Sequence, residues 1–262
     1  MPERPGLIWF EDSPRRIRGE LGGVTVVDST HAKLLHEHAH LPVYYFPEDD
    51  VRMDLLTVSD HRTRCPWKGE ASHWTLEAGG QVAENAAWSY PEPIEGAPPI
   101  AGYIAFYWNK LDRWFEEDEP AIVHARDPYH RVDVLESSRR VRVLLDGEIL
   151  AESDRPLALF ETGLPTRWYL PPDDVRLDLL EPSDTRTGCA YKGFAGYWSL
   201  KGGGEEGSDV AWYYADPHRD VERISGLIAF FNERVDIEID GEVQERPATQ
   251  WSRRPPRAVA PR

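Results

Sequence analysis

A cysteine, a lysine and a histidine lie close together in one short stretch of the chain. Cys65 and Lys68 are three residues apart, and His61 precedes the cysteine by four. A thiol beside a cation or an imidazole loses its proton more readily, because positive charge stabilises the thiolate. The spacing therefore makes Cys65, assisted by His61 and Lys68, a candidate catalytic nucleophile or redox group. The alternative is a buried cysteine that packs as a small hydrophobe, beside a solvated turn lysine.

Aromatic residues that could wall a binding pocket accompany this stretch. The candidates in the first half of the chain are Tyr45, Trp88 and Tyr90. With Lys68 as a polar anchor they would suit a small ligand, and the lysine charge favours an anionic one. The alternative is that these rings form the core, since aromatic side chains dominate small β-sheet cores.

The stretch Ser59–Gly69 is written a second time as Ser183–Gly193, at an offset of 124 residues. The offset holds without a gap from positions 15 and 139 to positions 112 and 236, and 39 of the 98 aligned positions are identical. Such a repeat indicates one duplicated domain. Thr185 replaces His61, so chemistry that needs the histidine would belong to the first copy alone. The equivalent ligand-binding candidates of the second copy are Lys192, Tyr169, Trp212 and Tyr214.

The repeat sets the expected domain organisation. We expect a first repeat domain at 14–116, a linker at 117–137 and a second repeat domain at 138–245. The remaining residues, 246–262, are rich in proline and arginine, and we expect a disordered tail. Because a short linker keeps the effective concentration of each domain near the other high, the repeats should pack on each other within the chain.

Short β-forming segments separated by glycine and proline predict a mainly β fold. Gly22-Gly23 lies between two extended segments and predicts a hairpin. Val43–Pro47 and Ile100–Tyr107 have the length and composition of strands, and the acidic residues after the first of them predict a short helical turn. His31–His40 carries four histidines around two leucines. We expect a short amphipathic helix there, with solvated histidines.

Composition and charge exclude several classes of partner. There are 46 acidic and 30 basic residues, a formal net charge of −16, which repels nucleic-acid phosphates and anionic lipid. No apolar run approaches the roughly 20 residues that span a bilayer, and the N-terminus lacks a signal-peptide core. We therefore expect a cytoplasmic protein without a nucleic-acid or membrane partner. Two cysteines give no zinc-binding pair, so neither a metal site nor a cofactor is predicted.

Four motifs of the first copy resemble one known family. They are Tyr44–Pro47, His61–Gly69, Trp88–Tyr90 and Ile100–Tyr107. The chain resembles a tandem copy of the domain of unknown function 427 family, which is sometimes labelled nucleotidyltransferase-like. The resemblance implies two tandem β-tent-like domains, each a small antiparallel sheet sandwich with one or two short helices.

The chain also departs from what the resemblance implies. Thr185, Gly188 and Ala190 break the family pattern in the second copy. Relatives of the β-tent type commonly hold zinc with four cysteines, which this chain lacks. It has neither a glycine-rich phosphate loop nor a paired-carboxylate motif attached to one, so the residues give the nucleotidyltransferase label no support.

Three functions stay open at the level of sequence. The main hypothesis is a module that binds a small ligand in an aromatic-walled pocket with a lysine anchor. The first alternative is an enzyme that uses Cys65 with His61 and Lys68. The second is a structural or interaction protein without a small-molecule site.

Overall fold

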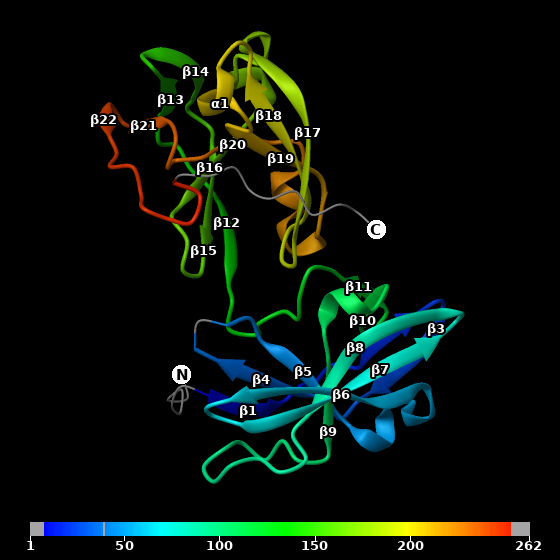
Figure 1. The fold of residues 1–262 in the computed structure, drawn as a ribbon. Coiled ribbons are helices and arrows are strands. Elements are labelled where there is room, and N and C mark those ends of the chain that lie inside the picture. Colours follow the sequence, from blue (N-terminus) through cyan, green and yellow to red (C-terminus); the bar gives the residue numbers. More distant parts are fainter. Residues whose placement is uncertain (1–7, 39, 253–262) are drawn as a thin grey trace. The chain divides into compact units, whose positions relative to one another are not determined.

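The computed structural model describes residues 8–38 and 40–252. The chain divides into two compact units, residues 1–127 and 128–262. Each unit has one seven-stranded and one four-stranded sheet, and the strand pairings within them are antiparallel (Figure 1). The predicted fold class, two tandem β-tent-like domains, is confirmed.

In the first unit the seven strands run in the order β1-β4-β5-β9-β8-β7-β6 and the four in the order β11-β10-β2-β3. The elements are β1 (Ile8–Asp12), β2 (Ile17–Leu21), β3 (Val24–Ser29), β4 (Lys33–Glu37), β5 (Val43–Pro47), η1 (Glu48–Asp50), η2 (Met53–Leu55), β6 (Leu56–Cys65), β7 (Gly69–Ala78), β8 (Gln81–Ser89), β9 (Tyr103–Phe106), η3 (Trp108–Lys110), β10 (Arg113–Glu116) and β11 (Glu119–Ala121).

The second unit repeats this plan, with sheet orders β12-β15-β16-β20-β19-β18-β17 and β14-β13-β21-β22. The elements are β12 (Val132–Glu136), β13 (Val141–Leu145), β14 (Glu148–Ser153), β15 (Leu157–Glu161), β16 (Arg167–Leu170), η4 (Pro172–Asp174), η5 (Leu177–Leu179), β17 (Leu180–Cys189), β18 (Gly193–Leu200), α1 (Gly204–Gly207), β19 (Ala211–Pro217), η6 (Arg219–Ile224), β20 (Ile228–Phe230), β21 (Asp236–Ile239) and β22 (Glu242–Val243).

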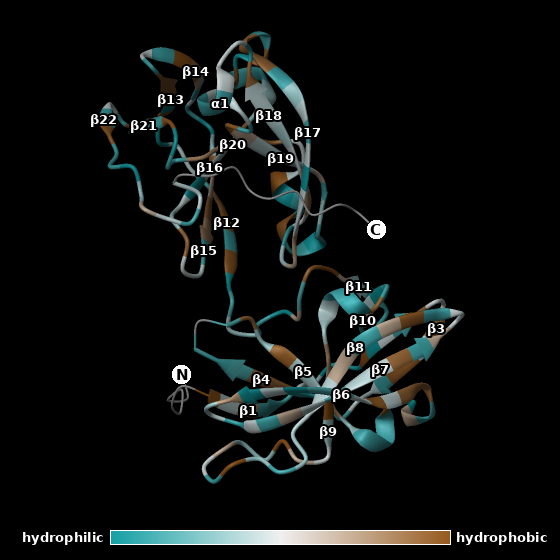
Figure 2. Cartoon of the chain, viewed as in Figure 1, coloured by the Kyte–Doolittle hydropathy of each residue, from teal (hydrophilic) through white to brown (hydrophobic). Residues whose placement is uncertain are grey.

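Both faces of the large sheet are apolar near its centre, because its middle strands are buried on two sides. In β5, Tyr44 and Phe46 point to the core shared with the small sheet, where they meet Ile17 and Trp114. Tyr45 lies between them in sequence and therefore points to the opposite face, which we call the outer face. Figure 2 shows hydrophobic colouring along part of β5, whereas β4 is largely hydrophilic in colour.

The outer face has its own apolar cluster. In the first unit the cluster contains Leu35, Tyr45, Ala71, Tyr90 and Ile100, all at most 5% exposed. In the second unit it contains Tyr169, Trp212, Tyr214 and Ile224, with Trp251 packed against it. Most of the proposed ligand-binding aromatic residues therefore lie on one face of each large sheet.

One secondary-structure prediction was wrong. Among the described residues of the segment from His31 to His40, which are 31–38 and 40, there is no helix, and Lys33–Glu37 forms strand β4. His36 is 4% exposed, its ring lies 4.3 Å from that of Trp9, and its Nε2 lies 2.7 Å from Glu11 Oε1. Burial on both faces removes the polar/apolar alternation that marks a strand, and the spacing of the histidines resembles the polar side of a helix.

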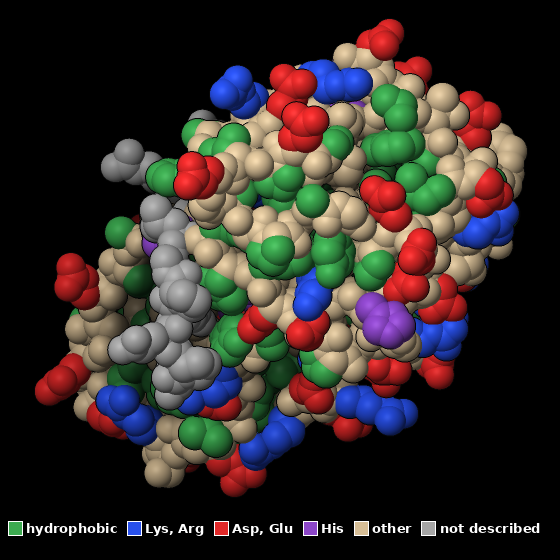
Figure 3. Space-filling model, turned by 90° about the horizontal axis from the view of Figure 1, so that it is seen from below, with side chains coloured by type: hydrophobic (Ala, Val, Ile, Leu, Met, Phe, Trp, Pro, Cys, Tyr) green, Lys and Arg blue, Asp and Glu red, His purple; other side chains and the backbone are tan. Residues whose placement is uncertain are grey.

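The predicted linker is described along its whole length, and the predicted tail only in part. Strands β11 and β12 lie within the predicted 117–137 linker. Of the predicted tail, residues 246–252 are described and residues 253–262 lie outside the described residues. Within the described part of the chain no helix is long and apolar enough to cross a membrane. On the face drawn in Figure 3, acidic and basic side chains are interspersed.

Candidate functional site

The duplicated stretch forms a long hairpin, β6–β7 in the first unit and β17–β18 in the second. The pairing register shifts between Val58 and Arg62, so β6 bulges there. The Arg62 guanidinium holds the bulge by donating through Nη1 to the carbonyl oxygens of Ser59 and His61, at 2.6 and 2.8 Å. Arg186 makes the same two bonds in the second unit. A bulge re-aims the side chains next to it, here residue 61 or 185.

The tip of the hairpin positions the lysine. Gly69 has φ +107°, a conformation that side chains strongly disfavour, and a Cβ there would lie 3.3 Å from the carbonyl oxygen of Glu92. Gly193 is equivalent, with φ +102°. Directly before the glycine, the Lys68 carbonyl accepts a bond from the Ile94 amide at 3.2 Å. The retained Lys-Gly pair is therefore a turn packed against a loop, and the lysine is 6% exposed.

Lys68 forms a buried ion pair with Glu37 at the end of β4. Three strands, β5, β9 and β8, separate β4 from β7 in the sheet. In a flat sheet these two strands would lie about 19 Å apart, at about 4.8 Å per strand. Direct contact means that the sheet curls around its outer face and that the ion pair bridges its two halves. The Lys68 ammonium also lies 5.5 Å from the centre of the Tyr90 ring.

The second unit repeats the pair as Lys192 and Glu161. Here the glutamate has another partner, because His130 Nε2 lies 3.0 Å from its Oε1. Burial acts to raise the pKa of Glu161, but the hydrogen bonds and charges of His130 and Lys192 outweigh it and lower the pKa below its ordinary value. The carboxylate is therefore ionised at neutral pH, and the pair is a true ion pair.

A row of aromatic side chains crosses the outer face of the first sheet. The strand register places Tyr45, Ala105, Trp88 and His73 opposite one another on four successive strands. Trp88 Nε1 donates to the Tyr45 hydroxyl at 3.2 Å, and burial raises the pKa of that hydroxyl far above its ordinary value. The second unit repeats the bond between Trp212 and Tyr169, at 3.0 Å.

At the bulge the row differs between the units. In the first unit the rings of His61 and His73 lie 4.4 Å apart, and His73 Nε2 lies 3.4 Å from the Tyr107 hydroxyl. Burial, followed by the nearby His61, lowers the pKa of His73. In the second unit the equivalent residues of these three are Thr185, Tyr197 and Phe231.

The histidine at position 73 corresponds to a hydrogen-bonded tyrosine in the second unit. The Tyr197 and Thr187 hydroxyls lie 2.6 Å apart. Burial raises the pKa of Tyr197 to about 12. Thr63, the equivalent of Thr187, is present in the first unit, so the two copies differ in the ring itself and not in its neighbour.

The structure does not assemble the predicted trio around Cys65. Cys65 is half-buried against the outer-face cluster. Four residues of extended strand place His61 about 13 Å away, at about 3.3 Å per residue, and Lys68 is turned to Glu37. Within the residues that the structure describes, no hydrogen bond or ion pair joins Cys65 to either. The described ranges also contain no group of three or more histidine, cysteine, aspartate or glutamate residues placed to hold a metal.

Sequence reasoning missed the glutamate and His73. Glu37 and Glu161 are one of the 39 identical pairs. They lie in a segment where all four histidines of the first copy are replaced in the second. The available signal was a charged residue retained in a segment where the only other identical pair is Leu35 and Leu159. His73 carried no such signal, because its neighbours are known only from the strand register.

The chain is thus a tandem of mainly β domains, each with an aromatic outer face and a buried lysine–glutamate pair. One family profile, described as Domain of unknown function (DUF427), matches it twice, over residues 9–117 and 133–241. The chain belongs to this family as a tandem copy. No curated protein matches it.

Proposed function

We propose that the first domain binds a small molecule with a planar ring on the outer face of its large sheet. The observation that carries the proposal is an accessible aromatic surface. The rings of Trp88 and Tyr107 lie 4.5 Å apart, Trp88 is half-buried and Tyr107 is 40% exposed. Aromatic faces of this kind pack favourably against another ring.

The difference between the domains supports the choice of the first. The equivalent residues of the second domain, Trp212 and Phe231, are only 7% and 5% exposed. Trp251 packs against their cluster, so part of that face is already occupied by the chain itself. The other candidates of the second domain are also buried: Tyr169, Tyr214 and Lys192 are at most 7% exposed.

Lys68 is the polar anchor in this proposal. Its ammonium group has three N–H donors, and the described residues give it one carboxylate oxygen, from Glu37, and the face of Tyr90. A ligand carboxylate would take a further donor through a charge-assisted bond. The ligand class is accordingly a small aromatic carboxylate.

The experiment is a thermal-shift titration of the full chain with benzoate, indole-3-carboxylate and neutral indole. A bound ligand raises the unfolding midpoint by mass action. We expect the carboxylates to raise it in the wild type and in Phe194→Ala, which removes a 50% exposed ring from the other domain. Tyr107→Ala should lose the shift. Equal shifts in wild type and Tyr107→Ala would place binding elsewhere.

The lysine anchor needs a variant that leaves no unpaired carboxylate behind. Lys68→Met combined with Glu37→Leu removes both charges of the pair. If Lys68 anchors the ligand, the double variant should bind the carboxylates weaker by about 1.5–3 kcal/mol, the usual worth of a bond to a charged group. Neutral indole should bind it as before. Unchanged carboxylate binding would remove Lys68 from the site.

A structural role for the lysines is the second candidate, and the ion pairs in both units favour it. Each lysine already has a carboxylate partner within its own sheet. The enzyme hypothesis has a separate test, because a nucleophilic Cys65 would be alkylated much faster than Cys189 at neutral pH. We expect slow labelling of both thiols.

A further inference from the structure

The second domain contains a buried ion pair that the first domain lacks. Arg167 on β16 and Glu233 after β20 have side chains 5% and 0% exposed, and the guanidinium binds both carboxylate oxygens at 2.7 Å. The equivalent residues of the first domain are Val43 and Asn109. Burying two charges is costly unless their remaining polar atoms are satisfied, so the other partners of this pair are informative.

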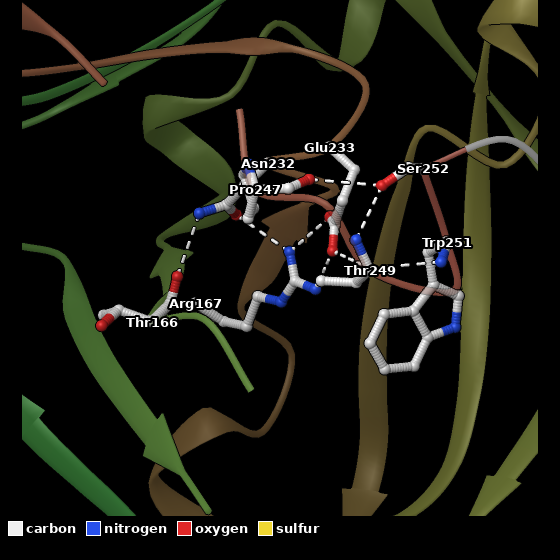
Figure 4. Close-up of polar contacts among 8 residues, drawn as sticks. All are labelled: Thr166, Arg167, Asn232, Glu233, Pro247, Thr249, Trp251 and Ser252. Carbon is white, nitrogen blue, oxygen red and sulfur yellow. Dashed lines mark hydrogen bonds and ion pairs between the residues drawn. The ribbon is translucent and has the colours of Figure 1, made fainter. Parts of the chain in front are cut away.

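Arg167 Nη1 also donates to Asn232 Oδ1 at 3.2 Å, and further partners come from the C-terminal segment Pro247–Ser252. The Thr249 hydroxyl donates to Glu233 Oε1 at 2.6 Å (Figure 4). Burial acts to raise the pKa of Glu233, but the bonds from Arg167 and Thr249 lower it, so the acceptor is an ionised carboxylate. The Trp251 ring centre lies 5.6 Å from the Arg167 guanidinium, which also lies 5.5 Å from the centre of the Trp212 ring.

The segment is folded so that the hydroxyl and the indole are presented together. The Thr249 amide donates to the Ser252 hydroxyl at 2.8 Å, and the Trp251 amide donates to the Thr249 hydroxyl at 3.2 Å. The Ser252 hydroxyl in turn donates to the Pro247 carbonyl at 3.2 Å. Such side-chain-to-backbone bonds form compact turns. The Gln250 side chain, between the two contact residues, is exposed.

We propose that the second domain contains a peptide-recognition site for a Thr-X-Trp turn, which the chain's own residues Thr249 to Trp251 fill. Glu233 accepts the hydrogen bond of the hydroxyl, and the indole contacts the Arg167 guanidinium and the Phe231 ring, whose centre lies 6.5 Å away. A short tether from β22 holds the segment at a high effective concentration, so an outside peptide binds only when the internal segment is weakened. The inference concerns a different domain from the proposed small-molecule site and does not depend on it.

The test uses the full chain with Thr249→Val and Trp251→Ala together, which empties the site without shortening the protein. A fluorescently labelled peptide of residues 246–252 is titrated and followed by anisotropy. We expect it to bind the double variant at least tenfold tighter than the wild-type chain, whose site is filled. A peptide with Gln250→Ala should bind like the original, and one with Thr249→Val at least tenfold weaker.

Three results would overturn the proposal: binding to neither chain, equal binding to both, or indifference to Thr249→Val in the peptide. If the double variant is too unstable for anisotropy, its thermal unfolding is followed with and without excess peptide. The peptide must then raise the unfolding midpoint of the variant by mass action. The absence of such a rise would contradict the proposal equally.

Discussion

At the scale of the residue, Lys68 is retained in both copies and is paired with Glu37. The pairing decides which substitutions can test the role of the lysine. Lys68 and Glu37 have side chains 8% and 20% exposed. Removing one charge from such a pair leaves the other buried and uncompensated, and this costs more than the pair itself contributes. If Lys68 served only to anchor a ligand, the single change Lys68→Met would leave the stability of the domain unchanged. Because Lys68 is paired with Glu37, the change must lower that stability.

We therefore expect Lys68→Met to lower the free energy of unfolding of the first domain by about 2–4 kcal/mol, near the range for breaking a buried pair. The combination Lys68→Met/Glu37→Leu should recover most of that loss. Urea unfolding of the three proteins measures it. A single variant as stable as the wild type would mean that the pair is solvated in solution.

His73 makes the stability of the first domain depend on pH. Its pKa is lowered in the folded protein, first by burial and then by His61, so the unfolded chain binds the proton more readily. The contribution of His73 to the free energy of unfolding is therefore fully present above the ordinary histidine pKa of about 6.5. It is lost as the pH falls below that value.

His73→Tyr is the matched control, because the second domain has Tyr197 there and the first retains the threonine that such a tyrosine contacts. We expect the wild type to lose more stability than His73→Tyr between pH 7.5 and 5.5, measured as the shift in urea midpoint. Identical shifts would show that other groups carry the acid sensitivity.

At the scale of the element, the hairpin tip depends on one glycine in each domain. Gly69 and Gly193 have φ above +100°, and a Cβ would lie 3.3 and 3.2 Å from a backbone carbonyl oxygen. Strain of this kind costs about 1–3 kcal/mol. The tip carries the lysine, so the same strain would disturb the ion pair.

We expect Gly69→Ala to destabilise the first domain more than Gly80→Ala does. Gly80 also has a positive φ, +77°, but a Cβ there meets nothing within 4 Å, so only the cost of the left-handed backbone conformation, about 1–2 kcal/mol, remains. Thermal unfolding of the two variants gives the comparison. Equal losses of stability would show that the loop from Pro91 to Ile100 can move away from the added Cβ without destabilising the domain.

At the scale of the whole molecule, each unit has complete sheets and its own clusters on both faces. A domain of about 120 residues buries enough surface to fold alone. The acidic charge is shared by both units and opposes association with other polyanions.

We expect residues 1–127 expressed alone to give a folded domain with a cooperative thermal transition, seen by circular dichroism. If the domains pack on each other, as the short linker predicts, the fragment should melt at a lower temperature than the first domain in the full chain. An unfolded fragment would contradict the independence of the cores. An unchanged midpoint would contradict the packing.

The sequence by itself determined the duplication, the mainly β class and most strands, because glycine and proline turns and β-forming runs are local signals. It also made Lys68 and Tyr45 candidates for the site, since both are retained in the second copy. It could not place β4, because a strand buried on both faces loses its alternation. The predicted catalytic trio is not brought together, because extended strand separates His61 from Cys65 and Lys68 is paired with Glu37.

Only the tertiary structure decided which residues meet across the fold. The Lys68–Glu37 pair joins strands that three others separate, and it exists because the sheet curls. The row from Tyr45 to His73 follows from strand register, which no spacing in the sequence encodes. Thr249 and Trp251 contact Glu233 and Arg167. The position of the turn that carries them depends on its packing against the second domain. Local periodicity fixes the elements, whereas contacts at long range depend on how the sheets bend and close.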